Sequence, residues 1–279
     1  MRFVVTRDVE EFAARTEQLL AAHLECNLLA TVVKSVLDGA HREPPPLLAM
    51  GIDADDEVAF AALRTPPFPL LVSPLEPGDA DTLVDLWLEV DPELPGVSSV
   101  PETARAIAAA WARRTGGEPR RTFEEAMHVL TVVNDPPTPA PGRLRLPEPD
   151  ERDLLVAWMR EFIIEARLVG AAQVETVVDD RLRYGGLLCW EDGEPASLIG
   201  LNHPVAGAVR IGPVYTPAPL RRRGYASSAV AAASRRALAG GATRCMLFTD
   251  LANPTSNKIY AEVGYRRCGD WEEIALERA

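Results

Sequence analysis

One stretch of this chain, residues 209–265, constrains its fold more than any other. It opens with an apolar run at 209–216 that predicts a strand, followed by the turn Arg221-Arg222-Arg223-Gly224. Beyond the turn, Ala226 and every third or fourth residue up to position 237 form one apolar helical face. The turn therefore combines free backbone N–H groups, a helix N-terminus and three cations. This combination predicts an anion site, most naturally for a pyrophosphate.

The spacing within this turn indicates a family. Gly224 has no side chain, so its backbone can approach a phosphate closely and adopt angles that other residues avoid. The pattern Arg-x-x-Gly-x-Ala, from Arg221 to Ala226, resembles the pyrophosphate loop of the GCN5-related N-acetyltransferases, the GNAT superfamily. It matches neither the dinucleotide fingerprint G-x-G-x-x-G nor the Gly-Lys-Ser/Thr of a P-loop. For this motif alone, an exposed arginine turn that caps a helix is the alternative.

A second signature follows a predicted buried, parallel strand at 245–249. Asn253, Ser256, Tyr260 and the pair Gly264-Tyr265 resemble the second GNAT signature at the family's spacing. Two signatures in the right order, separated by a helix and a strand, are more specific than either alone. The resemblance runs from about residue 143 to the last residue, roughly half of the chain.

The resemblance implies transfer of an acetyl or acyl group from acetyl-CoA (coenzyme A), a co-substrate used without a metal, to an amine. Backbone groups at the end of the 209–216 strand would bind the pantetheine arm, and the loop would bind the pyrophosphate. The implied cofactor-binding residues are Val214, Tyr215, Thr216, Arg221, Arg222, Arg223, Gly224, Tyr225, Ala226, Ser227, Asn253 and Ser256. Tyr260 is the implied catalytic acid, with its hydroxyl near the departing sulfur; simple packing between helix and sheet is the alternative.

The sequence does not identify a general base. Many family members carry a glutamate on the strand before the loop, whereas residues 210–216 contain no carboxylate. Glu165 and Asp250 are candidates by position, but a surface helix residue and a helix cap are the simpler interpretations. A water relay to a backbone carbonyl is the remaining route for the amine proton.

The net charge of the chain is concentrated in its first half. Residues 1–140 hold 11 Lys/Arg against 23 Asp/Glu, a net charge of −12, whereas residues 141–279 hold 18 of each. Because such a surface repels nucleic acid and anionic membranes, we expect neither as a partner. The charged N-terminus does not resemble a signal peptide, no apolar run suits a membrane span, and four cysteines lack metal-ligand pairing. These features predict a cytoplasmic protein.

The first half is predicted to repeat the element order of the second. In the first half we expect helices at 8–38, 79–90 and 101–114 and strands at 47–51, 58–64, 70–73 and 127–133. In the second half we expect a helical region at 151–180, broken near Gly170, and then a hairpin about Asp192-Gly193. The predicted fold is α/β of the α+β type. It has two GNAT-like domains, each a mixed, largely antiparallel sheet that is splayed at the cofactor groove and flanked by helices. Residues 1–133 would form a degenerate domain, 134–150 a proline-rich linker, and 151–279 the catalytic domain.

The first half lacks the chemistry of the phosphate loop. Its counterpart, residues 75–80, keeps the Gly-x-Ala spacing, but Pro77 has no N–H, and Glu76 and Asp79 would repel a phosphate. We therefore expect coenzyme A to bind only the second half.

Three functions are compatible with these observations. The leading hypothesis is an N-acetyltransferase whose amine acceptor, a small molecule or a peptide, is not identified by the sequence. The alternative is a coenzyme A-binding sensor or interaction module without catalysis, and a third is an unrelated phosphate-binding α/β protein. The missing strand carboxylate favours the sensor, whereas Tyr260 favours the enzyme. The assembly is expected to be a monomer or a homodimer.

Overall fold

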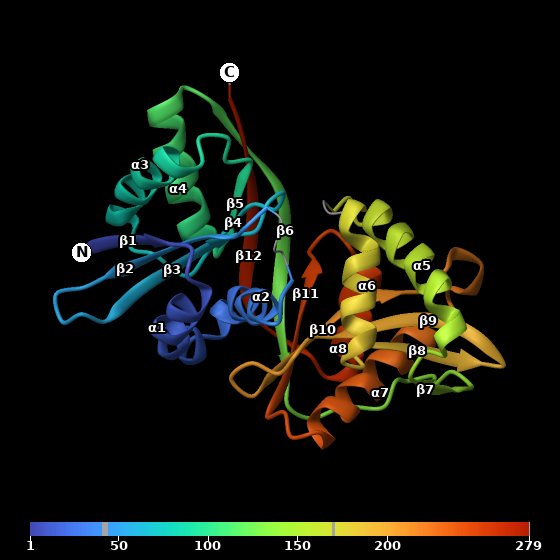
Figure 1. Cartoon of the computed structure of the whole chain (residues 1–279). Coiled ribbons are helices and arrows are strands. Elements are labelled where there is room, and N and C mark those ends of the chain that lie inside the picture. Colours follow the sequence, from blue (N-terminus) through green and yellow to red (C-terminus); the bar gives the residue numbers. More distant parts are fainter. Residues whose placement is uncertain (41–43, 169–170, 279) are drawn as a thin grey trace. The chain divides into compact units, whose positions relative to one another are not determined.

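The computed structural model describes residues 1–40, 44–168 and 171–278. The chain divides into two compact units, which are drawn from blue to red along the sequence in Figure 1. The first unit consists of Met1–Ala126 and Gly269–Ala279, and the second of Met127–Cys268.

The first unit is a mixed sheet flanked by helices. Along the chain its elements are β1 (Arg2–Thr6), α1 (Val9–Ala22), α2 (Asn27–Leu37), β2 (Leu47–Ile52), β3 (Val58–Arg64), β4 (Leu70–Val72), α3 (Ala80–Val90), β5 (Gly96–Ser99), α4 (Pro101–Thr115) and β6 (Glu118–Leu130). The neighbouring strands follow the order β1-β2-β3-β4-β5-β12-β6, where β12 is Arg266–Glu277. Strands β4 and β5 pair in parallel, whereas β1–β2, β2–β3, β3–β4 and β5–β12 are antiparallel.

The second unit repeats this order of elements. It contains β7 (Arg143–Arg145), α5 (Arg152–Glu165), α6 (Val174–Arg183), β8 (Leu187–Asp192), β9 (Glu194–Leu201), β10 (Ala208–Tyr215), α7 (Tyr225–Ala239), β11 (Arg244–Asp250) and α8 (Pro254–Val263). Strands β7 to β11 are neighbours in sequence order, antiparallel except for the parallel pair β10–β11. The predicted fold class, with two similar α+β domains, is confirmed.

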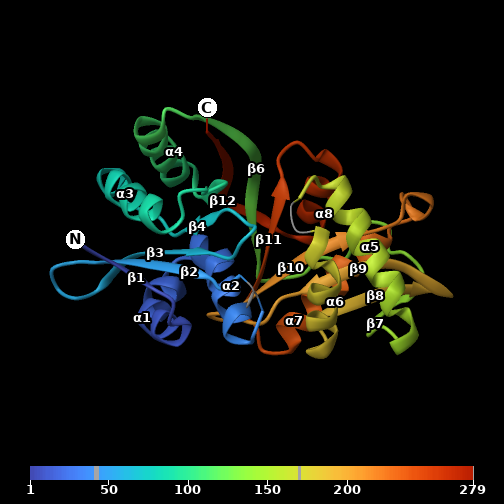
Figure 2. The same cartoon turned by 45° about the horizontal axis from the view of Figure 1, so that its top comes forward.

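Helices cover both faces of the second sheet. One buried cluster joins α5 and α6 to the strands through Leu155, Val178, Leu187 and Tyr215. A different cluster joins α7 to the strands and includes Ala229 and Val263. Figure 2 shows α5, α6 and α7 around strands β8 to β11. Helix α7 therefore covers one face of the sheet, and α5 and α6 cover the other.

The last strand of the chain belongs to the first unit. Within β12, Trp271, Ile274 and Leu276 are buried, and the Trp271 Nε1 donates to Ser98 Oγ at 2.7 Å. The predicted domain 151–279 differs from the second unit at this point, because residues after Cys268 pair with β5. Pairing between such distant segments leaves no local sequence pattern, which is why the sequence predicted a simple division.

The proline-rich segment 134–150 packs on the second unit. It contains β7, whose Arg143 pairs with Glu191 of β8, and the Trp190 Nε1 donates to Pro141 O at 2.9 Å. Because β7 is an edge strand, the prolines on either side of it remove no hydrogen bond from the sheet interior. The segment predicted to be a linker is therefore part of the compact unit.

Two predicted helical regions are each divided. The region 8–38 forms α1 and α2, separated by a short turn of 3₁₀-helix, Leu24–Cys26, because the chain leaves the helical conformation at His23. The region 151–180 forms α5 and α6. The break expected near Gly170 lies outside the described residues.

Candidate functional site

Strands β10 and β11 pair at their beginnings and then separate. Their parallel register joins Ala208 to Arg244, Val209 to Cys245 and Arg210 to Met246. Farther along, β10 is paired with β9 on its other side, with a register shift between Ile211 and Val214. The β10 edge that faces β11 therefore offers backbone N–H and C=O groups from about Ile211 onward. This separation is the splay that the sequence predicted.

The N-terminus of α7 follows β10 and is uncapped. Its N-cap is Gly224, with a φ of 82°, and no described side chain caps the helix. Because the first N–H groups of a helix have no acceptor within it, those of α7 are available to an anion. Arg222 also has a positive φ, 63°, a conformation that is uncommon for residues with a side chain and that clusters at ligand-binding loops.

The three arginines of the loop are exposed, but two of them have protein partners. Arg221 donates from Nη2 to the two oxygens of Glu165, at 2.8 and 2.6 Å, and from Nε to Thr216 O at 2.7 Å. Arg223 donates to Pro219 O at 3.3 Å. The side chain of Arg222 makes no hydrogen bond or ion pair within the described part of the chain. The loop therefore keeps at least one unpaired cation beside the helix N-terminus.

Gly224 is required by a neighbouring segment of the protein. A Cβ atom at this position would lie 3.0 Å from Thr138 O and 3.6 Å from the Cβ of Ala140. The Ala140 N–H donates to Ser228 Oγ at 2.8 Å, which anchors that segment on α7. The space beside Gly224 is thus filled by protein backbone, whereas the sequence suggested that it was left open for a phosphate.

The remaining side chains of the loop point into the protein. Tyr225 is buried and its hydroxyl donates to Asp192 Oδ2 at 2.6 Å, while Ser227 donates from Oγ to Gly224 O at 2.9 Å. Ala226 is partly buried. These three residues can therefore serve an anion through their backbone N–H groups.

The end of β10 is held by side-chain hydrogen bonds. Ser197 Oγ donates to Tyr215 O at 2.8 Å and lies 2.9 Å from Thr216 Oγ1. The hydroxyl of Tyr215 donates to Glu161 Oε2 at 2.6 Å. Burial and this bond raise the pKa of Tyr215 to about 12. Val214 is partly buried and packs against the α7 cluster, whereas Tyr215 packs beneath α5 and α6. The end of β10 is therefore held on both faces of the sheet.

Helix α8 begins at the second signature. Asn253 caps it, with Oδ1 accepting from Ser256 N at 3.1 Å. Asp250 accepts from Ala252 N at 2.7 Å within the preceding turn, so the cap is Asn253 and not Asp250. Asn253 and the carboxylate of Asp250 are therefore both engaged with nearby backbone N–H groups.

Tyr260 lies on α8 and packs against the α7 cluster. Its ring meets that of Tyr265 edge-on, with centroids 6.0 Å apart and an interplanar angle of 69°. Burial raises the pKa of Tyr260 to about 12, so the phenol is protonated at neutral pH. Its hydroxyl donates to no acceptor among the described residues. It is therefore free to donate to a bound molecule.

The sequence of this unit matches a known family. Residues 151–265 match the sequence model of the Acetyltransferase (GNAT) family. They are a GNAT domain. The GNAT family and fold indicate acyl transfer in general. No sequence among the curated proteins matches the chain.

Solved GNAT structures share the fold of the whole chain. A GCN5-related N-acetyltransferase from Sphaerobacter thermophilus is 16% identical, with a TM-score of 0.60 over 99% of this chain and 96% of that one. A GNAT-family acetyltransferase from Colwellia psychrerythraea is 11% identical, with a TM-score of 0.60 over all of both chains. A tandem GNAT protein from the clavulanic acid biosynthesis pathway is 13% identical, with a TM-score of 0.55 over 99% and 98%. The two-domain GNAT arrangement is therefore shared, and at these identities the likeness concerns the fold alone.

The first unit has the GNAT order of elements, but its strands β4 and β5 do not leave an open groove like that between β10 and β11. At the end of β4, Val72 O accepts from the buried Ser99 Oγ at 2.7 Å. Leu75 N then donates to the buried Thr103 Oγ1 at 3.0 Å. These bonds join the end of β4 to β5 and α4, where β10 and β11 separate in the second unit. In addition, Gly78 has no positive φ and so lacks the conformation of Gly224.

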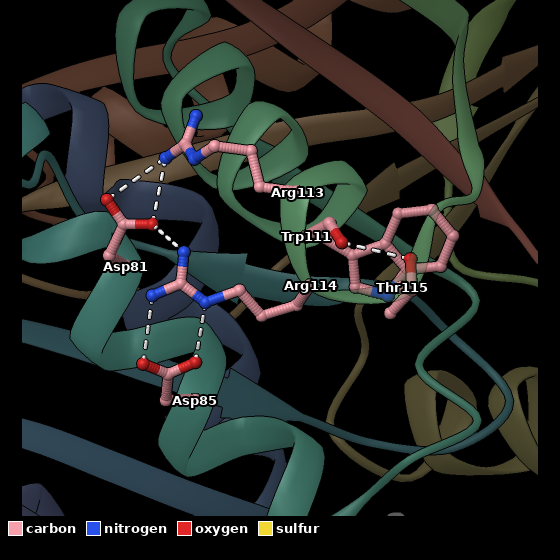
Figure 3. Close-up of polar contacts among 6 residues, drawn as sticks. All are labelled: Asp81, Asp85, Trp111, Arg113, Arg114 and Thr115. Atoms are coloured by element: carbon pink, nitrogen blue, oxygen red, sulfur yellow. Dashed lines mark hydrogen bonds and ion pairs between the residues drawn. The ribbon is translucent and has the colours of Figure 1, made fainter.

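Ion pairs also tie α3 to α4 in the first unit (Figure 3). Asp81 accepts from Arg113 at 2.8 and 3.0 Å and also from Arg114. Asp85 accepts from Arg114 at 2.7 and 3.0 Å. The arginines hold the pKa values of both carboxyls below their usual range. These two carboxylates of α3 are thus held ionised and paired with α4, whereas α7 carries no carboxylate.

Two observations concern other kinds of site. In residues 1–40, 44–168 and 171–278, no three His, Cys, Asp or Glu side chains gather as they would around a metal ion. None of the helices in these ranges is long and apolar enough to cross a membrane.

Sequence reasoning missed two side chains near the groove. Glu161 receives the Tyr215 hydroxyl, and its spacing of four residues from Glu165 on a helix was an available signal. Arg181 donates to Gly212 O at 2.8 Å, at the register shift of β10. This contact depends on the fold, so a helical pattern alone does not predict it.

Proposed function

We propose that the second unit binds acetyl-CoA as a substrate and transfers its acetyl group to an amine. The observation that carries this proposal is the separation of β10 from β11 beside an uncapped helix N-terminus. An open strand edge suits the amide groups of a pantetheine arm, and the helix N-terminus suits a pyrophosphate. Both ligand groups belong to one molecule, and the GNAT domain supplies both features in sequence.

The proposed binding residues divide by the group they use. Val214, Tyr215 and Thr216 would bind the pantetheine through the backbone, and Gly224 to Ser227 would bind the pyrophosphate through N–H groups. Arg222 would add charge directly, and Arg221 and Arg223 after exchanging a protein acceptor for phosphate. Asn253 and Ser256 would contact the ligand at the start of α8, where the cap already orders the chain.

Tyr260 would act on the leaving group. The amine nitrogen attacks the thioester carbonyl carbon, the C–S bond breaks, and the thiolate departs as the amine proton passes to water. A phenol with a pKa of about 12 is a weaker acid than a thiol, whose ordinary pKa is about 8.5. The hydroxyl therefore stabilises the thiolate by donating a hydrogen bond, without giving up its proton. The sequence analysis expected Tyr260 to be a general acid; we propose instead that it stabilises the charge of the thiolate.

The alternative proposal is a sensor that binds coenzyme A without turnover. The observation that favours it is the engagement of the nearby carboxylates: Glu165 pairs with Arg221, and Asp250 accepts from a backbone N–H. Neither is then a free base. Transfer would then require the amine to lose its proton to water.

The test combines binding and turnover on the full chain. We expect calorimetry with coenzyme A to give one site per chain, and acetyl-CoA with a panel of amines to yield free thiol and N-acetyl product together. Binding without product from any amine would favour the sensor. Two binding sites would contradict the closed groove of the first unit, and absence of binding would overturn the proposed function.

A further inference from the structure

Arg181 of α6 is a partly buried cation that lacks a carboxylate partner among the described residues. Its Nη1 donates to Gly212 O at 2.8 Å, and its Nη2 donates to Asn202 Oδ1 at 3.4 Å. A guanidinium has five N–H donors, so these two bonds leave three without a partner in the described chain. Burial lowers the pKa of Arg181, yet arginine stays charged in proteins because its ordinary pKa exceeds 12.

The other arginines of α5 and α6 differ from Arg181 in having carboxylate partners. Arg152 pairs with Asp179 at 2.6 Å, Arg160 with Glu175 at 2.5 Å, and Arg183 with Asp180 at 2.5 Å. A charge that leaves water without an opposite charge is costly, and arginine is rarely buried unless it is paired. Arg181, which has no carboxylate partner among the described residues, is therefore a partly buried arginine, whereas the exposed Arg160 and Arg183 are paired. Stability alone would favour the opposite arrangement, with the buried arginine paired.

The surrounding backbone makes room for this arginine. A Cβ atom at Gly200 of β9 would lie 2.3 Å from Arg181 Nη1 and 2.5 Å from Gly212 O. Glycine at 200 thus lets the guanidinium cross β9 and reach β10. Gly212 lies within the register shift of β10, where the edge toward β11 becomes free. Arg181 therefore contacts β10 from the β9 side, at the point where the pairing of β10 with β11 has ended.

The neighbours of Arg181 are polar and aromatic. Asn202 presents its amide, and the His203 ring lies over that of Tyr184 with centroids 3.8 Å apart. Tyr184 is 37% exposed, so this corner of the domain reaches the surface. This corner therefore brings a guanidinium, an amide and two aromatic rings together near the surface.

We propose that Arg181 binds a carboxylate of the acceptor, so that the acceptor is an amine carrying a carboxylate, as in an amino acid. This inference rests on the proposed function, because it places the amine at the β10 groove. A guanidinium matches a carboxylate in charge and in its paired donor geometry. A carboxylate carries the single negative charge that one guanidinium neutralises.

The experiment compares amines that differ only in this group. Each of several L-amino acids is assayed with acetyl-CoA beside its own carboxamide, and kcat/KM is measured for both. We expect the wild type to favour the carboxylate by at least tenfold. Carboxamides have the more readily deprotonated amine, which biases the assay against this result. Arg181→Met should bring the ratio to one or below, and Arg181→Lys should leave it between that value and the wild-type ratio.

Arg183→Met is the matched control, because Arg183 is on the same helix but is exposed and paired with Asp180. It should keep the wild-type ratio. A general loss of activity in a variant lowers kcat/KM for both amines alike and leaves their ratio unchanged. The wild-type ratio is measured on the unaltered protein, so it does not depend on the folding of any variant. Equal or faster transfer to the carboxamides would overturn this inference while leaving the acetyltransferase intact. No transfer to either member of any pair would also overturn this inference, and the panel of other amines would then test the acetyltransferase separately.

Discussion

The Nη2 of Arg221 lies 2.8 and 2.6 Å from the two carboxylate oxygens of Glu165. The pair joins the phosphate-loop motif to the end of α5, and both side chains are about half exposed, at 41% and 49%. An exposed pair of this kind contributes little to stability. Its importance is that Glu165 competes with any phosphate for the same guanidinium.

Glu165→Gln is therefore expected to strengthen coenzyme A binding. Loss of the carboxylate frees Arg221 and removes a negative charge near the pyrophosphate, which together should lower Kd by about two- to fivefold. Calorimetry at low ionic strength measures this change. Glu175→Gln is the matched control, since Glu175 pairs with Arg160 on the neighbouring helices. A weaker or unchanged affinity in Glu165→Gln would show that Arg221 does not bind the cofactor.

Gly224→Ala tests the shape of the loop. The change adds about 1–2 kcal/mol of strain at a φ of 82° and presses a methyl group against Thr138 O. We expect lower stability and at least a tenfold loss of coenzyme A affinity. Gly193→Ala separates these effects, because Gly193 has a φ of 76° but no atom within 4 Å of its Cβ position. If both variants bind coenzyme A equally well, the loop does not hold the phosphate.

Tyr260→Phe removes one hydroxyl that makes no hydrogen bond to the described residues. We expect kcat to fall at least tenfold while coenzyme A affinity and Tm change little. Tyr265→Phe is the contrasting variant: it loses the 2.8 Å contact with Ser234 Oγ, so its Tm should fall. Full turnover by Tyr260→Phe, with chemistry rate-limiting, would assign Tyr260 to packing alone.

The pKa of Tyr260 also predicts a pH dependence of stability. Because it is raised from 10 to about 12 in the folded protein, the native state holds this proton more tightly than the unfolded state. The resulting stabilisation is complete below pH 10 and is lost as the pH rises toward 12. The unfolding free energy of the wild type should therefore fall relative to that of Tyr260→Phe over that range. A constant difference from pH 9 to 12 would contradict the burial of this phenol.

Local patterns predicted much of the second unit. The apolar run before Arg221 and the glycine-terminated helix after it are local signals, and both elements occur at the predicted places. The phosphate-loop motif was also readable, because its residues are contiguous. What the motif did not show is the partner of each side chain: Glu165 is 56 residues from Arg221, and Thr138 approaches Gly224 from the proline-rich segment.

The strand arrangement of the first unit was not readable for a related reason. The sequence indicated a strand at 127–133, but β6 starts at Glu118, and its first residues are mostly charged and exposed. β12 was not predicted, and it pairs with β5 across more than 170 residues. Such pairing is decided by the buried faces of both strands together, and neither strand alone specifies its neighbour.

Trp271→Ala tests whether β12 stabilises the first unit. The Trp271 side chain is 2% exposed and its Nε1 donates to Ser98 Oγ on β5, so truncation leaves a large cavity and an unpaired hydroxyl. We expect the unfolding free energy to fall by about 3–5 kcal/mol, with amide-exchange protection lost in β4 and β5. Trp271→Phe keeps most of the ring volume and removes the hydrogen bond, so it should cost less than Trp271→Ala. Unchanged protection of β5 in Trp271→Ala would mean that β12 is not part of the core of this unit, and the predicted division of the chain near residue 134 would regain support.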